Sequence, residues 1–120
     1  MKTLVRVGIG MCCIVAASFG ITMYRGQLMD ASCYQQNQAN EKVWSQCVPT
    51  ATTTTFAVHA NGSVRMLDDA GNQKAMTALK EGNLKVDKRG DMPVTIDGSR
   101  QGNTIKVEGI RARGSEISVH

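Results

Sequence analysis

Two cysteines are the residues of this 120-residue chain whose type and spacing best fit defined chemistry. Cys33 and Cys47 would close a loop of about 15 residues if they formed a disulfide. A redox pair usually has the closer C-x-x-C spacing, and a metal site would need histidine or acidic partners nearby. The only histidines are His59 and His120. We therefore predict a structural disulfide, with the redox and metal-ligand readings as alternatives.

Trp44 is the residue we single out as a candidate contact for a ligand or a partner. It lies inside the Cys33–Cys47 loop, in a segment rich in glutamine and asparagine. An indole in such a loop either packs against the disulfide and closes one end of the domain, or offers a surface for binding. Both interpretations are open from the sequence.

The sequence predicts no enzyme, no cofactor and no metal site. It contains no nucleophile elbow, no phosphate-binding loop and no zinc-protease helix motif. His59 is the only internal histidine, and it falls within a predicted strand, where we expect a structural or surface role. Asp68 and Asp69 could begin a calcium site, but a calcium loop needs more oxygen ligands at regular spacing.

The N-terminal segment is typical of a signal peptide. Lys2 and Arg6 precede an uncharged apolar run over 7–21, and small residues stand at Ser18 and Gly20. We predict a signal peptide over 1–20, with cleavage after Gly20, and one domain over 21–120. An uncleaved anchor is the alternative, although the apolar run of about 15 residues is shorter than the ~20 needed to span a bilayer.

Export has two consequences for the rest of the chain. The periplasm or the extracellular space would be oxidising, which favours the disulfide. Removal of Lys2 and Arg6 lowers the formal net charge from +4 to +2, and no dense basic cluster remains. We therefore expect no nucleic-acid binding, and membrane contact only through the signal segment.

Alternating apolar and polar residues predict five strands and one short helix. The helix is expected over 73–80, with Asn72 as its N-cap and Gly82 at its end. The threonine run at 50–55 is expected to lead as extended chain into the second strand, and 52–58 is a candidate edge strand for pairing with a partner. The remaining strands are expected over 24–30, 64–68, 93–100 and 104–112, and a helical turn over 40–45.

Glycine and asparagine residues predict where the chain turns between these strands and where the strands bend. Asn61-Gly62 between two strands predicts a tight hairpin. Gly26 marks a bend, and Gly98 and Gly109 mark paired kinks that let a small sheet curl. Five strands with a helix between the third and fourth form the order of a small OB-like β-barrel, preceded here by the signal-peptide helix. A flat sheet with one covering helix is the alternative.

The segment Gly26–Cys33 follows the pattern G-x-L-x-D-x-x-C. Together with the later runs at 47–50, 55–58, 62–68, 94–98 and 102–107, it resembles a family of uncharacterised secreted bacterial domains of acidobacterial type. The resemblance covers about residues 24–112 and implies an OB-like shape, without an activity to transfer. The chain departs from the pattern at Arg65 and in the charged segment 85–91.

These observations favour an exported, non-catalytic domain that acts by binding. Its expected partner is an envelope protein or a small ligand, and the alternative is a module for a small molecule or an oligosaccharide. We expect a monomer.

Overall fold

The computed structural model describes residues 21–113. The elements follow in the order β1 (Thr22–Asp30), α2 (Ala31–Gln36), α3 (Glu41–Trp44), β2 (Phe56–Ala60), β3 (Ser63–Leu67), α4 (Asp69–Lys80), β4 (Pro93–Gln101) and β5 (Thr104–Ala112). The predicted signal peptide with its cleavage after Gly20 lies outside the described residues, as does the tail from residue 114. Within the described part, no helix is long and apolar enough to span a membrane.

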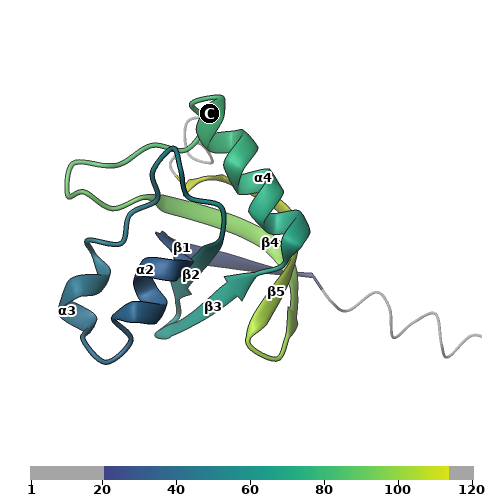
Figure 1. The fold of residues 1–120 in the computed structure, drawn as a ribbon. Helices are drawn as coiled ribbons and strands as arrows, with labels where there is room; N and C mark the ends of the chain where they lie inside the picture. The colour runs from purple at the N-terminus through teal and green to yellow at the C-terminus, as the bar shows by residue number, and fades with distance from the viewer. Residues whose placement is uncertain (1–20, 114–120) are drawn as a thin grey trace, which may run out of the picture.

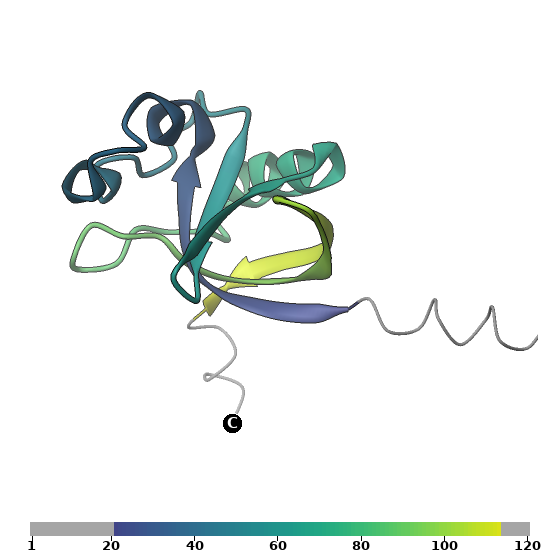
Figure 2. The same ribbon diagram turned by 90° about the horizontal axis from the view of Figure 1, so that it is seen from below.

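The five strands form one mixed sheet in the hydrogen-bonded order β1-β2-β3-β5-β4. β4 also pairs with β1, so the order of neighbours returns to the strand where it began. The pairings are antiparallel except for a short parallel one, in which Met66 and Leu67 of β3 lie beside Thr104 and Ile105 of β5. The strands curve around a common interior (Figure 2). The predicted mainly β class, with α4 between the third and fourth strands, is confirmed.

β1 joins the two halves of this sheet by changing its partner along its length. Residues 22–27 pair with β4, and residues 27–30 pair with β2. The change falls beside Gly26, where the sequence predicts a bend. A Cβ atom at Gly26 would lie 2.1 Å from the carbonyl oxygen of His59. Only a glycine therefore lets β1 pass so close to the backbone of β2.

Two further turn and kink predictions are confirmed. Asn61 and Gly62 have φ angles of 54° and 78°, as a tight hairpin between β2 and β3 requires. The register between β4 and β5 shifts between Asp97 and Gly98, so a β-bulge bends this pair. Gly109 stands opposite Asp97 at the same bulge.

An apolar core fills the interior of the sheet. Its most deeply buried large side chains come from four of the strands: Leu28, Phe56, Val58, Val94, Ile96 and Ile105. Ala75 and Ala78 of α4 belong to the same cluster, so α4 contributes its small-residue face to the core. α4 lies on one side of the strands, and α2 and α3 lie on the other (Figure 1).

α4 begins one turn earlier than the sequence predicts. Asp68, not Asn72, is its N-cap: the Asp68 carboxylate accepts a hydrogen bond from the Gly71 N–H at 2.9 Å. The same Oδ1 atom accepts from the buried Val107 N–H of β5 at 3.1 Å. The Asn72 side chain instead accepts from the Phe56 N–H at 2.9 Å, which ties α4 to the start of β2.

Asp68→Ala is expected to lower the free energy of unfolding by about 2 kcal/mol. The substitution removes an N-cap, worth ~1 kcal/mol, and leaves the Val107 N–H without its acceptor, at a further cost of ~1–3 kcal/mol. Asp69→Ala is the matched control, because Asp69 is exposed in the first turn and makes no such bond. Urea denaturation of both variants measures the difference. Equal stability of the two variants would contradict the bridging role of Asp68.

The threonine run does not extend β2, contrary to the prediction. β2 begins at Phe56, and residues 50–53 form a turn in which the Thr50 N–H donates to the Thr53 hydroxyl at 2.9 Å. Hydroxyl hydrogen bonds to nearby backbone compete with strand pairing. β2 also lies between β1 and β3, so the predicted edge strand over 52–58 is wrong.

Candidate functional site

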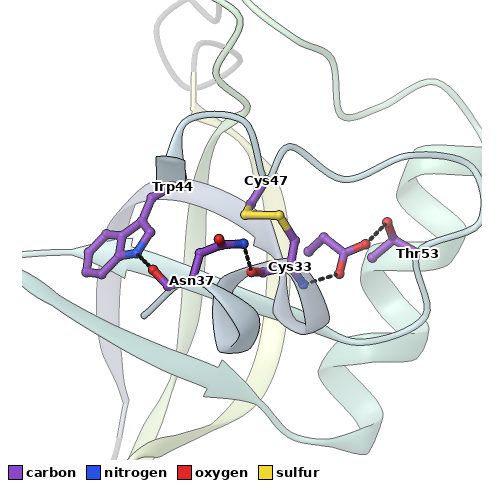
Figure 3. The surroundings of a disulfide bond; sticks show 6 residues. Cys33, Asn37, Trp44, Cys47 and Thr53 are labelled. Atoms are coloured by element: carbon purple, nitrogen blue, oxygen red, sulfur yellow. Dashed lines mark hydrogen bonds between the residues drawn. A yellow bond between two sulfur atoms is a disulfide. The ribbon is translucent and has the colours of Figure 1, made fainter. Parts of the chain in front are cut away.

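The predicted disulfide between Cys33 and Cys47 is present. Cys33 lies in α2, Cys47 follows α3, and their Cα atoms are 5.4 Å apart. Cys47 is buried, and Cys33 packs against the same apolar cluster. The bond therefore joins two short helices into one cap over the strands, as Figure 3 shows for its immediate surroundings.

Asp30, at the end of β1, anchors this cap to the sheet. Its Oδ1 atom accepts from the Cys33 N–H at 3.1 Å and caps α2, and its Oδ2 atom accepts from the Thr53 hydroxyl at 2.8 Å. The Asp30 N–H donates to the carbonyl oxygen of Cys47 at 2.7 Å. One residue thus fixes both disulfide partners and the threonine turn.

The cap covers a second apolar cluster on the outer face of the strands, which we name the outer cluster. Met29 and Ala57 supply its strand side, and Ala31 and Cys47 supply its cap side. Tyr34, Trp44, Val64 and Met66 pack against it. The Cys33–Cys47 loop is therefore a structural layer with its own small core, and the polar residues between the cysteines conceal it in the sequence.

Trp44 is held in place by three neighbours. Its indole N–H donates to the carbonyl oxygen of Asn37 at 2.9 Å (Figure 3). Its ring meets the rings of Tyr34 and His59 edge to face, at centroid distances of 5.1 and 5.3 Å. Both interpretations of Trp44 in the sequence thus have a basis: the side chain packs against the cap, and it also remains partly exposed beside a pocket.

A small pocket of about 270 Å³ opens between the cap and the outer face of β1 and β2. We name it the Trp44 pocket. Trp44 forms one wall, and Met29, Val48 and Met92 are among its apolar lining residues. Its polar lining residues are Gln27, Glu41, Ser45, His59 and Asp91. This size admits a small molecule or the terminal group of a larger one.

Two of the five polar residues that line the Trp44 pocket, Glu41 and Asp91, are carboxylates, which only accept hydrogen bonds when ionised. Neither Glu41 nor Asp91 has an ion-pair partner for its carboxylate among residues 21–113. The Oε1 atom of Gln27 is buried without a hydrogen-bond partner. Among the described residues, no lysine or arginine lines the pocket. The site is therefore negative and rich in acceptors, with one aromatic wall.

A tight turn over 87–91 places Asp91 at the pocket. The Asp87 carboxylate accepts hydrogen bonds from the backbone N–H groups of Asp91 at 3.0 Å and Arg89 at 2.9 Å. Both hydrogen bonds lower the pKa of Asp87 below its usual value, and the bond from the Asp91 N–H has the larger effect. The Asp87 N–H also donates to the carbonyl oxygen of Asp91 at 2.7 Å. The second half of the charged segment 85–91 is therefore organised by one of its own side chains.

The sequence identified some members of this site and missed others. Trp44 and the disulfide stand out in the sequence, and His59, for which we expect a structural or surface role, packs edge to face against Trp44. No sequence motif marks the other polar members of the site, Gln27, Glu41 and Asp91. They come from β1, α3 and the 87–91 turn, and they meet only in the folded chain.

In the described part of the chain, no three histidine, cysteine, aspartate or glutamate side chains lie close enough together to hold a metal ion. The predicted calcium alternative at Asp68 and Asp69 finds no support there, because Asp68 is engaged as the cap of α4.

Comparison with protein-family models, with curated proteins and with solved structures gave no match for this chain.

Proposed function

We propose that this chain is an exported, non-catalytic binding module with an OB-like barrel, and that the Trp44 pocket holds its ligand. The cyclic order of strand pairing, with a helix between the third and fourth strands, supports the barrel. The disulfide supports an oxidising compartment such as the periplasm or the extracellular space. Among the described residues, the pocket has two carboxylates but no nucleophile that is hydrogen-bonded to a base. We therefore favour binding over catalysis.

The ligand we propose is a small organic cation, such as an amine or an amino sugar. The observation that carries this is the pairing of two carboxylates, Glu41 and Asp91, in one small pocket without a neighbouring lysine or arginine among the described residues. An ammonium group donates charge-assisted hydrogen bonds to carboxylates such as these. The Trp44 ring adds a face that attracts a cation. A neutral sugar would leave the carboxylates without an opposite charge.

The test compares sugars that share one ring and differ in the substituent at C2, which is charged only in glucosamine. Glucosamine, N-acetylglucosamine and glucose are titrated against the purified chain by calorimetry and by thermal shift. We expect saturable binding and stabilisation with glucosamine, and clearly weaker effects with the two neutral sugars. Diaminopentane tests whether the ammonium group suffices without the sugar ring.

Substitutions that preserve shape identify the site. Glu41→Gln with Asp91→Asn is expected to weaken binding of the cation by about tenfold or more, because two charge-assisted hydrogen bonds become neutral ones. Glu108→Gln is the matched control, since Glu108 is exposed on β5 and outside the pocket. Trp44→Ala is less informative, because this ring also packs in the cap. The proposal fails if the neutral sugars bind equally well, or if the double variant binds as the control does.

An envelope protein partner is the remaining possibility from the sequence, and the same experiment separates it. A partner would appear in crosslinking from intact cells through residues around Trp44, without any response of the isolated chain to amines.

A further inference from the structure

A second and larger hollow lies away from the Trp44 pocket, and the proposed function does not use it. It measures about 600 Å³, within the usual size of ligand sites. The threonine turn at 50–54 forms one wall, and the second half of α4 together with residues 84–86 forms the other. We name it the threonine groove.

The floor of the threonine groove is apolar and continuous with the core. Leu84 and Met92 line it and belong to the buried core, and Met76 and Leu79 of α4 pack against that core from the side. Val86 lies at the groove with 51% of its surface exposed, which is unusual for a large apolar residue in this chain. The groove thus leaves apolar surface in water that a bound apolar chain would cover.

The threonine wall offers few free polar groups despite its composition. The Thr53 hydroxyl donates to Asp30 at 2.8 Å, and the hydroxyls of Thr50 and Thr52 are 3.1 Å apart and hydrogen-bonded. These hydroxyls therefore already have partners within the turn or on Asp30, and the groove does not require a ligand rich in hydrogen bonds.

The charges at the groove are of one sign. Lys80 at the end of α4 and Lys85 in the following loop both line it, and no acidic side chain among the described residues does. Neither lysine has an ion-pair partner within residues 21–113. Charge complementarity therefore favours an occupant with an anionic group, and the apolar floor favours an occupant with a hydrocarbon chain.

From these features we propose that the threonine groove binds a single-chain anionic amphiphile of the fatty-acid type. The hydrocarbon chain lies over Met76, Leu79 and Leu84, and the carboxylate lies between Lys80 and Lys85. The methionines suit such a ligand because their flexible side chains adapt to an irregular chain. The groove and the Trp44 pocket are lined in common only by Met92, so this site stands independently of the proposed function.

The experiment titrates the purified chain with dodecanoate below its micelle concentration, followed by NMR or by displacement of a fluorescent fatty acid. We expect one saturable site, with shifts at residues of the threonine turn and at the end of α4. Affinity should rise about three- to fourfold for each added methylene from hexanoate upward, as burial of apolar surface predicts. Dodecanol, which has the same chain without the charge, should bind more weakly.

Matched lysine substitutions localise the carboxylate. Lys80→Gln with Lys85→Gln is expected to weaken dodecanoate binding about fivefold while leaving dodecanol unchanged, because exposed charges contribute modestly. Lys74→Gln with Lys106→Gln removes the same charge away from the groove and should change neither. Leu79→Gln should weaken both ligands, with circular dichroism as the check on folding.

Three results would overturn this assignment. One is equal weakening by both lysine pairs, which would indicate only a general effect of net charge. Another is a set of NMR shifts away from the groove, which would place the amphiphile elsewhere on the chain. Binding of phospholipid vesicles without binding of free dodecanoate would also contradict it, because that points to a membrane surface.

Discussion

Replacing Cys33 and Cys47 together by alanine is expected to lower the free energy of unfolding by about 3 kcal/mol, since their bond closes a loop of 15 residues. That is a large share of the ~5–15 kcal/mol typical of a small domain. The loop depends on the bond because its own apolar content is small. Outside the outer cluster, the segment between the cysteines is largely polar and exposed.

The loss of stability in this double variant should differ between parts of the molecule. The core inside the sheet draws residues from all five strands and from α4, and it does not include the disulfide. The outer cluster includes Cys47 and receives Trp44. Hydrogen exchange should therefore show the cap opening in the double variant while β4 and β5 remain protected. Binding at the Trp44 pocket should fall with the cap, because Glu41, Trp44 and Ser45 come from it.

Reduction provides the control for this variant. Dithiothreitol should lower the stability of the wild-type chain to that of the double variant, and it should leave the variant unchanged. If the variant unfolds at the same urea concentration as the oxidised wild type, the bond contributes nothing measurable and the cap is held by Asp30 and the outer cluster alone.

The sequence predicted the sheet well because its strands bury one face. Alternation over β4 and β5, and the Asn61-Gly62 turn, determine pairing and register locally. The beginning of α4 was harder to predict because Gly71 in its first turn is typical of a loop. The structure gives a packing reason for that glycine: a Cβ atom there would lie 2.4 Å from a methyl carbon of Val107.

The cap was the least predictable part of the fold. α2 has no apolar stripe at helical spacing, and it forms because Asp30 caps its first turn and the disulfide closes the loop. The threonine run has high strand propensity, but its hydroxyls bond within a turn and to Asp30. The conformations of α2 and of the threonine run both depend on Asp30, which lies outside either segment. Hydrophobic pattern and residue propensity within a segment do not take such a side chain into account.

The candidate site shows the same limit more strongly. Trp44 stands out in the sequence by type and by its place between the cysteines. Glu41 and Asp91 are ordinary surface residues by every sequence criterion, and only the fold brings the cap and the 87–91 turn together at one pocket. A site of this kind depends on tertiary placement, so it has no contiguous motif.

Gly26→Ala is the single substitution expected to damage the fold most, by about 3 kcal/mol or more. The new methyl group would meet the carbonyl oxygen of His59 at 2.1 Å and its carbon at 2.8 Å. Both obstacles are backbone atoms of β2, so no side chain can rotate away to make room. Relief would require β1 to move from β2, and β1 is also the strand that pairs with β4. The pairing of β1 with both neighbours and the packing of the core would be disturbed together.

Gly109→Ala is the matched control, because it makes the same chemical change at another strand glycine. The nearest atom to its added methyl group is Asp97 Oδ2 at 3.7 Å, which is an ordinary contact, and Gly109 does not have a positive φ. We expect its stability to stay within about 1 kcal/mol of wild type, since Gly→Ala at a compatible position costs little or stabilises. Urea denaturation of both variants measures the comparison. If Gly26→Ala is as stable as Gly109→Ala, β1 does not need its close approach to β2, and the bend at Gly26 is not required for β1 to pair with both β2 and β4.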